Sequence, residues 1–139
     1  MANAVSQTLT APGFWFERIR YTSSRDTIVF SADYQATTHP APALRRIRIE
    51  VRALVSGLPT PEMFRAFEWV DGDGYISAGA ALRRGEPCSF SISTHDERID
   101  WTVRPVTLLT LASSDPFDGC PREKRHSLAG YLTLLPLAP

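Results

Sequence analysis

The stretch Cys88–Arg104, with the sequence CSFSISTHDERIDWTVR, dictates a structure almost residue by residue. Apolar and polar residues alternate strictly on both arms, and a two-residue turn at Asp96-Glu97 sets Phe90 opposite Val103. A four-residue loop at His95–Arg98 fits the same register. Alternation with apolar cross-strand pairs is typical of a half-buried antiparallel hairpin. The stretch therefore predicts two paired strands.

Outside this hairpin, shorter runs of alternating or continuous apolar residues predict further strands. They fall at 14–21, 26–34, 45–55, 75–82, 106–111 and 128–135. The run at 45–55 has the longest alternation, with Ile47, Ile49 and Val51 among the residues predicted to face inward. In the strand at 26–34 the residues predicted to face inward are Ile28, Phe30, Ala32 and Tyr34. Residues 36–43, which contain two prolines, are predicted to be a connection, and Phe64 and Phe67 are predicted to pack on a sheet. Pro105 predicts a bend that carries one long strand from one sheet to another.

A single helix is predicted, at residues 61–68. It begins at Thr60-Pro61-Glu62, where a hydroxyl, a proline and an acid stand in the order favoured at helix N-termini. About seven or eight short strands with one minor helix predict an all-β fold, an antiparallel β-sandwich. A small closed β-barrel is the alternative.

The chain length and the amino-acid composition favour one globular domain spanning 1–139, with an N-terminal arm at 1–13 and a long loop at 112–127. No export signal or apolar run long enough for a membrane span is visible, so we expect a cytoplasmic protein without a membrane partner. The two cysteines, Cys88 and Cys120, are then expected to be free thiols. Fifteen basic and fifteen acidic residues give a net charge of zero, which disfavours nucleic acid as a partner.

The segment Gly13-Phe14-Trp15-Phe16-Glu17 resembles the first-strand signature of lipocalins, in which a glycine lies two residues before a tryptophan. The resemblance covers these five residues. It implies a barrel with Trp15 closing one end and a small apolar ligand in the cup. The rival interpretation is that Trp15 is a core residue of an edge strand.

Two groups of residues have the chemistry of an active site. His95, Asp96, Glu97 and Asp100 cluster at the predicted hairpin tip, and an imidazole with carboxylates suits a metal or acid–base catalysis. Cys120 and His126 lie on one predicted loop and could form a thiolate pair. A solvated turn and an ordinary loop are the preferred explanations of the two groups, so we predict no enzyme activity, metal or cofactor.

Binding surfaces are better supported than catalytic ones. The strand at 45–55 sets Arg46, Arg48 and Arg52 in a stripe on its outer face, which Glu50 interrupts. The long loop 112–127 joins an aromatic residue to basic ones, as suits recognition of a protein or polyanion. Those loop residues are Phe117, Arg122, Lys124, Arg125 and His126.

The strand at 14–21 has apolar residues on both faces, with Phe14 and Phe16 on one of them. The sequence therefore predicts a non-catalytic binding or assembly module that acts through protein–protein contacts, including self-association. The alternative is a small β-barrel that binds an apolar ligand, as the lipocalin resemblance implies.

Overall fold

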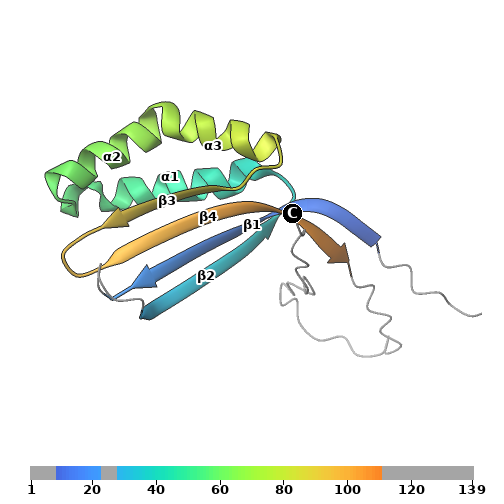
Figure 1. The fold of residues 1–139 in the computed structure, drawn as a ribbon, viewed down its shortest axis with the longest axis horizontal. Helices are drawn as coiled ribbons and strands as arrows, with labels where there is room; N and C mark the ends of the chain where they lie inside the picture. The colour runs from blue at the N-terminus through green and yellow to red at the C-terminus, as the bar shows by residue number, and fades with distance from the viewer. Residues whose placement is uncertain (1–8, 23–27, 111–139) are drawn as a thin grey trace, which may run out of the picture.

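The computed structural model describes residues 9–22 and 28–110, which form a four-stranded antiparallel sheet, three α-helices and one 3-10 turn. The elements are β1 (Leu9–Tyr21), β2 (Val29–Thr37), α1 (Pro40–Leu54), η1 (Val55–Gly57), α2 (Thr60–Asp71), α3 (Asp73–Arg83), β3 (Cys88–Ser93) and β4 (Arg98–Thr110). Their order across the sheet is β2-β1-β4-β3, so β2 and β3 are the edge strands. Figure 1 shows the helices grouped on one side of the sheet.

The hydrophobic core lies between these helices and one face of the sheet. Phe16 of β1 and Val103 of β4 are paired across the strands and are both fully buried, as is Trp101. The helices contribute Ala43, Leu44, Ile47, Val51, Ala66, Trp69, Val70, Ala78 and Leu82. Trp69 stacks on Phe90 with ring centroids 5.1 Å apart, and Phe90 stacks on Trp101 at 6.2 Å. Aromatic contact therefore runs without a break from α2 to the middle of the sheet.

The predicted all-β fold is wrong, for the sandwich and for the barrel alike. The sheet is a single open one with two edges, and the segments predicted as strands at 45–55 and 75–82 are the helices α1 and α3. In α1 the buried residues are Ala43, Leu44, Ile47 and Val51. Their spacing of three and four residues is that of one helix face, whereas Ile49, predicted inward, is 61% exposed.

The small residues of α3 explain why it is a helix packed on α1. Its buried residues are Ala78, Gly79 and Leu82, again at helical spacing. A β-carbon at Gly79 would lie 3.6 Å from Leu44 Cδ1, so the two helices approach each other closely here. The apolar content of 75–82 therefore serves helix–helix contact, which an alternating strand pattern does not describe.

The predicted helix at 61–68 is confirmed, and it extends over Thr60–Asp71. Its contacts differ from the expected ones. Phe64 and Phe67, predicted to pack on a sheet, are 65% and 44% exposed, while Trp69 and Val70 are buried. The N-cap position is Pro59, and no side chain caps the first turn.

The hairpin at Cys88–Arg104 is confirmed as β3 and β4, but the predicted register is wrong by two residues. Phe90 lies opposite Trp101, where Val103 was expected, and the loop is 94–97. Thr94 N–H donates to Glu97 O at 2.7 Å, and Glu97 N–H donates to Thr94 Oγ1 at 3.1 Å. These bonds fix the turn one residue earlier than Asp96-Glu97. A shift of two residues leaves every side chain on its predicted face.

β1 confirms the predicted strand at 14–21 and begins earlier, so residues 9–13 of the expected N-terminal arm are part of the sheet. β4 runs through Pro105 to Thr110, pairing with β1 along its whole length. It therefore stays in one sheet, and the predicted passage to a second sheet is wrong. The predicted loop at 112–127 and strand at 128–135 lie outside the described residues.

Candidate interaction surface

The face of the sheet turned away from the core is the main surface feature of the described chain, and we call it the uncovered face. The register assigns to it the side chains that alternate with the core residues. Its β1 and β2 half comprises Trp15, Glu17, Ile19, Tyr21, Val29, Ala32, Tyr34 and Ala36. Its β3 and β4 half comprises Ser89, Ser91, Ser93, Arg98, Asp100, Thr102 and Arg104. Beyond Arg104, β4 continues on this side with Val106 and Leu108, which are both buried. No helix among the described residues packs on this face.

The half formed by β1 and β2 is aromatic. Trp15 and Tyr34 stack with ring centroids 5.5 Å apart and an interplanar angle of 22°. Tyr34 is 51% exposed and Phe30 65% exposed. Large rings held against each other at the surface supply apolar contact area at little cost in conformational entropy, as in many protein interfaces. The prediction that Ala32 and Tyr34 face inward is therefore wrong, and Phe30, also predicted inward, is exposed at the point where the register of β2 shifts.

The half formed by β3 and β4 is polar. The guanidinium of Arg98 lies 4.3 Å from the centre of the Tyr21 ring and forms a salt bridge to Asp100 at 3.2 Å. The charged residues of the whole face are Glu17, Arg98, Asp100 and Arg104, two of each sign. A face with no net charge does not favour a polyanion.

The two edges of the sheet differ in how their backbone groups are satisfied. At β3, Arg65 Nη2 donates to Ser91 O at 3.3 Å and Ser93 N–H donates to Glu62 Oε2 at 3.0 Å. Both side chains come from α2, so this helix covers the β3 edge. Within residues 9–22 and 28–110, no helix side chain bonds to the backbone of β2. β2 is thus the open edge of the described sheet.

The predicted arginine stripe does not exist as one surface, because residues 45–55 lie on a helix. The Arg46 side chain lies against the core face of the sheet, with its guanidinium 4.4 Å from the centre of the Phe16 ring. It donates to Asp33 and, at 2.9 Å, to Glu50. Arg48 and Arg52 instead both reach Asp71, at 3.4 and 2.5 Å. All three arginines are committed to carboxylates of this chain, so none is a free phosphate-binding group.

Arg46 belongs to a polar cluster between α1 and the sheet. Glu50 accepts from Arg46 through Oε1, lies 3.1 Å from Arg18, and accepts from Trp101 Nε1 through Oε2 at 2.7 Å. The cluster ties α1 to the two central strands through charge-assisted hydrogen bonds. It fixes the position of α1 over the sheet, and we assign it a structural role.

The hydrogen bond from Arg46, together with the nearby positive charges, lowers the pKa of Asp33 below its ordinary value, against the effect of partial burial. A carboxyl whose pKa is lowered by folding stabilises the protein above its unfolded pKa, and this stabilisation is lost as pH falls through the lowered value.

We therefore expect Asp33→Asn to reduce the free energy of unfolding at pH 7 by no more than about 1 kcal/mol, since the pair is partly exposed. The difference from wild type should shrink below about pH 4. Urea unfolding of both proteins at several pH values measures it. Asp96→Asn, at an exposed turn position, is the control; a difference for Asp33→Asn that stays constant down to low pH would contradict the assignment.

Phe14 and Phe16, predicted as binding residues, lie on the core side of β1. Phe16 is fully buried and Phe14 packs against the core. The opposite face of the same strand, with Trp15, Ile19 and Tyr21, is the one that no described helix covers. The other predicted binding residues (Phe117, Arg122, Lys124, Arg125 and His126) lie outside the described residues, as does Cys120.

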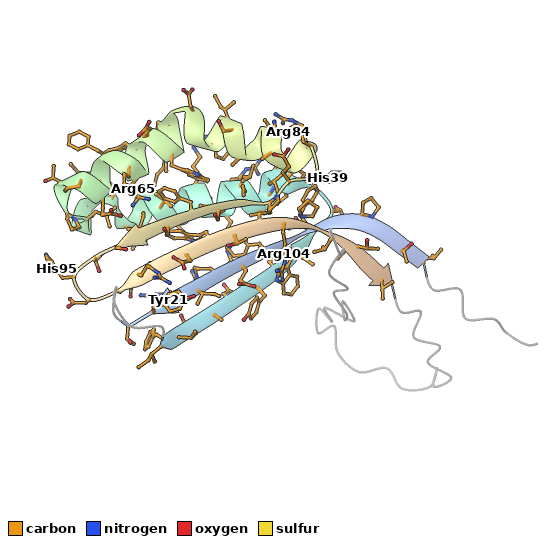
Figure 2. The ribbon with its side chains drawn as sticks, viewed as in Figure 1. Tyr21, His39, Arg65, Arg84, His95 and Arg104 are labelled. Atoms are coloured by element: carbon orange, nitrogen blue, oxygen red, sulfur yellow. The ribbon has the colours of Figure 1, made fainter. Side chains whose placement is uncertain are left out.

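The predicted cluster at the hairpin tip is not assembled as an active site. Glu97 accepts two bonds from Arg20 Nη2, at 2.9 and 2.6 Å, and Asp100 pairs with Arg98. Figure 2 shows His95 at the left-hand tip of the molecule and His39 well away from it, near Arg84. In residues 9–22 and 28–110, no group of three His, Cys, Asp or Glu side chains is placed to hold a metal ion. Burial raises the pKa of the Cys88 thiol, so it is less nucleophilic than a free thiol.

A surface hollow of about 460 Å³ lies where β3 and β4 meet Arg65 of α2. Its lining residues are Arg65, Ser89, Phe90, Ser91, Arg98, Asp100, Trp101 and Thr102. Asp100 is the one carboxylate in this lining, and it is paired with Arg98. The hollow therefore offers polar contacts to a partner and no unpaired base for proton transfer.

Sequence reasoning missed the residues that now matter most. Tyr34 and Ala32 were expected in a core, and Glu50 appeared as an interruption in a basic stripe. The pairing of Glu62 and Arg65, at 2.9 Å and three residues apart, is a signal in the sequence that marks the outer side of α2. Nothing in the sequence shows that this pair reaches the β3 backbone.

Comparison with known proteins finds no matching family model, no matching curated protein and no matching solved structure. Function must therefore be inferred from the chain itself. Among the helices of the described residues, none has the length and apolar character needed to cross a membrane.

Proposed function

We propose that this protein is a non-catalytic binding or assembly module that acts through protein–protein contacts made by the uncovered face. The observation that carries the proposal is the stacked pair of half-buried Trp15 and exposed Tyr34, on a sheet face that no described helix covers. Aromatic residues are the ones most enriched at the centres of protein interfaces. Ile19 and Tyr21 extend the same apolar surface along β1.

The arrangement of polar residues supports the same proposal. A serine ladder and balanced charges on β3 and β4 border the aromatic half, which is how an apolar interface centre meets a polar rim. Arg46, Arg48 and Arg52 of α1, which were predicted as a binding stripe, are bonded to Asp33, Glu50 and Asp71. The surface thus favours a folded protein partner over an anionic polymer.

The ligand-binding barrel loses its basis with the corrected fold. An open sheet with two edge strands encloses no cup, and Trp15 lies on the uncovered face at the middle of β1, stacked on Tyr34. We therefore do not carry the lipocalin-like alternative further.

Trp15→Glu tests the proposal, because a carboxylate at the centre of an apolar contact is costly to bury. The tagged protein is used to capture its partners, and Ile76→Glu is the matched control, since Ile76 is 66% exposed on α3. Circular dichroism and thermal melts establish that both variants fold.

We expect wild type and Ile76→Glu to retain the same protein, another copy of the chain included, and Trp15→Glu to lose at least about nine-tenths of it. Retention of the same proteins to the same extent by all three would overturn the assignment of the uncovered face.

A further inference from the structure

We infer that the occupant of the open edge is a second copy of this chain, joined through antiparallel pairing of β2 with β2 of the partner. The inference rests on the proposed function and deepens it, since it names the partner and the strand. Two such copies form one continuous sheet with both uncovered faces on the same side. The aromatic halves of the two copies then become adjacent.

The difference between the two sheet edges is the first observation. Glu62 and Arg65 of α2 occupy the outward backbone groups of β3 at Ser91 and Ser93. β2 has the same need for partners, and no described helix supplies them. A sheet edge with unpaired N–H and C=O groups is a template for another strand.

The sequence of β2 is the second observation, because it lacks the devices that normally protect an edge. Val29–Thr37 reads VFSADYQAT, with no proline and no basic residue. Its one charge, Asp33, points to the core side and is bonded to Arg46 and Arg18. Four of the exposed large apolar residues fall on this strand or at its start: Ile28, Val29, Phe30 and Tyr34.

Self-complementarity is the third observation. A two-fold axis perpendicular to the sheet places the uncovered faces of both copies on the same side. Even-numbered residues of β2 then lie opposite even-numbered residues of the partner's β2, and odd-numbered residues opposite odd-numbered ones. With the axis at Ala32, Ser31 faces Asp33 of the second copy. With the axis at Tyr34, the two Tyr34 rings meet and Asp33 faces Gln35. Neither register opposes like charges, and the second pairs aromatic rings across the strands.

The zero net charge of the chain and the balanced charges of the uncovered face let two copies approach without repulsion. A single strand pair buries less surface than the roughly 1,200 Å² of a stable interface. We therefore expect an association that depends on protein concentration.

The test uses two double variants of the full chain, Ala32→Lys/Tyr34→Lys and Ala32→Glu/Tyr34→Glu. In both registers the substituted residue at the two-fold axis lies opposite the same residue of the second copy. Two copies of one variant therefore place like charges together, whereas one copy of each variant places a lysine opposite a glutamate. Molar mass is measured by light scattering on a size-exclusion column across a concentration series. Ile76→Lys/Ser77→Lys, at two exposed positions of α3 away from the sheet, is the matched control.

We expect wild type and control to dimerise, each charged double variant to weaken self-association by about tenfold or more, and an equimolar mixture of the two to restore it. Restoration on mixing also shows that both variants are folded. A mass of one chain for wild type at every concentration, or equal weakening by the α3 control, would overturn the pairing. Trp15→Glu would still be expected to lose its captured partner in that case. Failure of the β2 pairing is therefore distinguishable from failure of the proposed function.

Discussion

Trp101→Ala is expected to lower the free energy of unfolding by about 3–5 kcal/mol, the largest loss for any single change considered for this chain. The side chain is fully buried at the centre of the sheet and stacks on Phe90. Removing it opens a cavity between β4 and α2 and breaks the aromatic contact that joins them. Urea denaturation followed by far-ultraviolet circular dichroism measures the loss.

Trp101→Phe separates the contribution of the indole N–H from that of aromatic packing. It keeps most of the apolar contact but removes the N–H that donates to Glu50 at 2.7 Å, so we expect a smaller loss of about 1–3 kcal/mol. A loss from Trp101→Ala no larger than that of an exposed substitution would contradict the placement of this ring in the core.

Glu50→Ala is expected to cost about 2–4 kcal/mol, because it leaves Arg18, Arg46 and the Trp101 N–H without their shared acceptor. The carboxylate is only 20% exposed, so solvent replaces these bonds poorly. Glu68→Ala, an exposed acid on α2, should change stability by no more than about 0.5 kcal/mol. Thermal or urea unfolding compares the two.

A double-mutant cycle of Trp101→Phe with Glu50→Gln measures how strongly the two residues depend on each other. We expect a coupling of about 1 kcal/mol, since one change removes the donor and the other weakens the acceptor. Equal costs for Glu50→Ala and Glu68→Ala would show that the cluster does not hold α1 to the sheet.

Strands were the part of the fold most readable from the sequence. The alternation at Cys88–Arg104 predicted the correct faces for both strands of the hairpin. Its register depends on two bonds of Thr94 in the turn, which no pattern of apolar residues encodes. A shift by two residues leaves each side chain on the same face, so the alternation of apolar and polar residues cannot distinguish the two registers.

α1 shows why the fold class was missed. Ile47, Ile49 and Val51 alternate as in a strand, but Leu44, Ile47 and Val51 also fit one face of a helix. A short apolar run can fit both the two-residue period of a strand and the 3.6-residue period of a helix. Its tertiary contacts then determine which of the two forms. Pro40, in the first turn of α1, fits a helix start, and it was interpreted as part of a connection.

The surface could be predicted only in outline. Apolar residues on both faces of the strand at 14–21 predicted a contact on each face, and one of the two faces packs on the core. Which face meets the core depends on where α1 lies, and that follows from the pairing of Arg46 with Asp33 and of Glu50 with Trp101. These contacts join residues far apart in the sequence, so the wrong pair of aromatic residues, Phe14 and Phe16, was assigned to binding.

Amide hydrogen exchange at low and high protein concentration tests the central claim most directly, that β2 and the uncovered face are where this protein meets its partner. We predict that amides of β2 exchange more slowly as concentration rises, while those of β3, already covered by Glu62 and Arg65, do not change. Exchange in β2 that is independent of concentration, or protection that appears in α3 instead, would contradict the account.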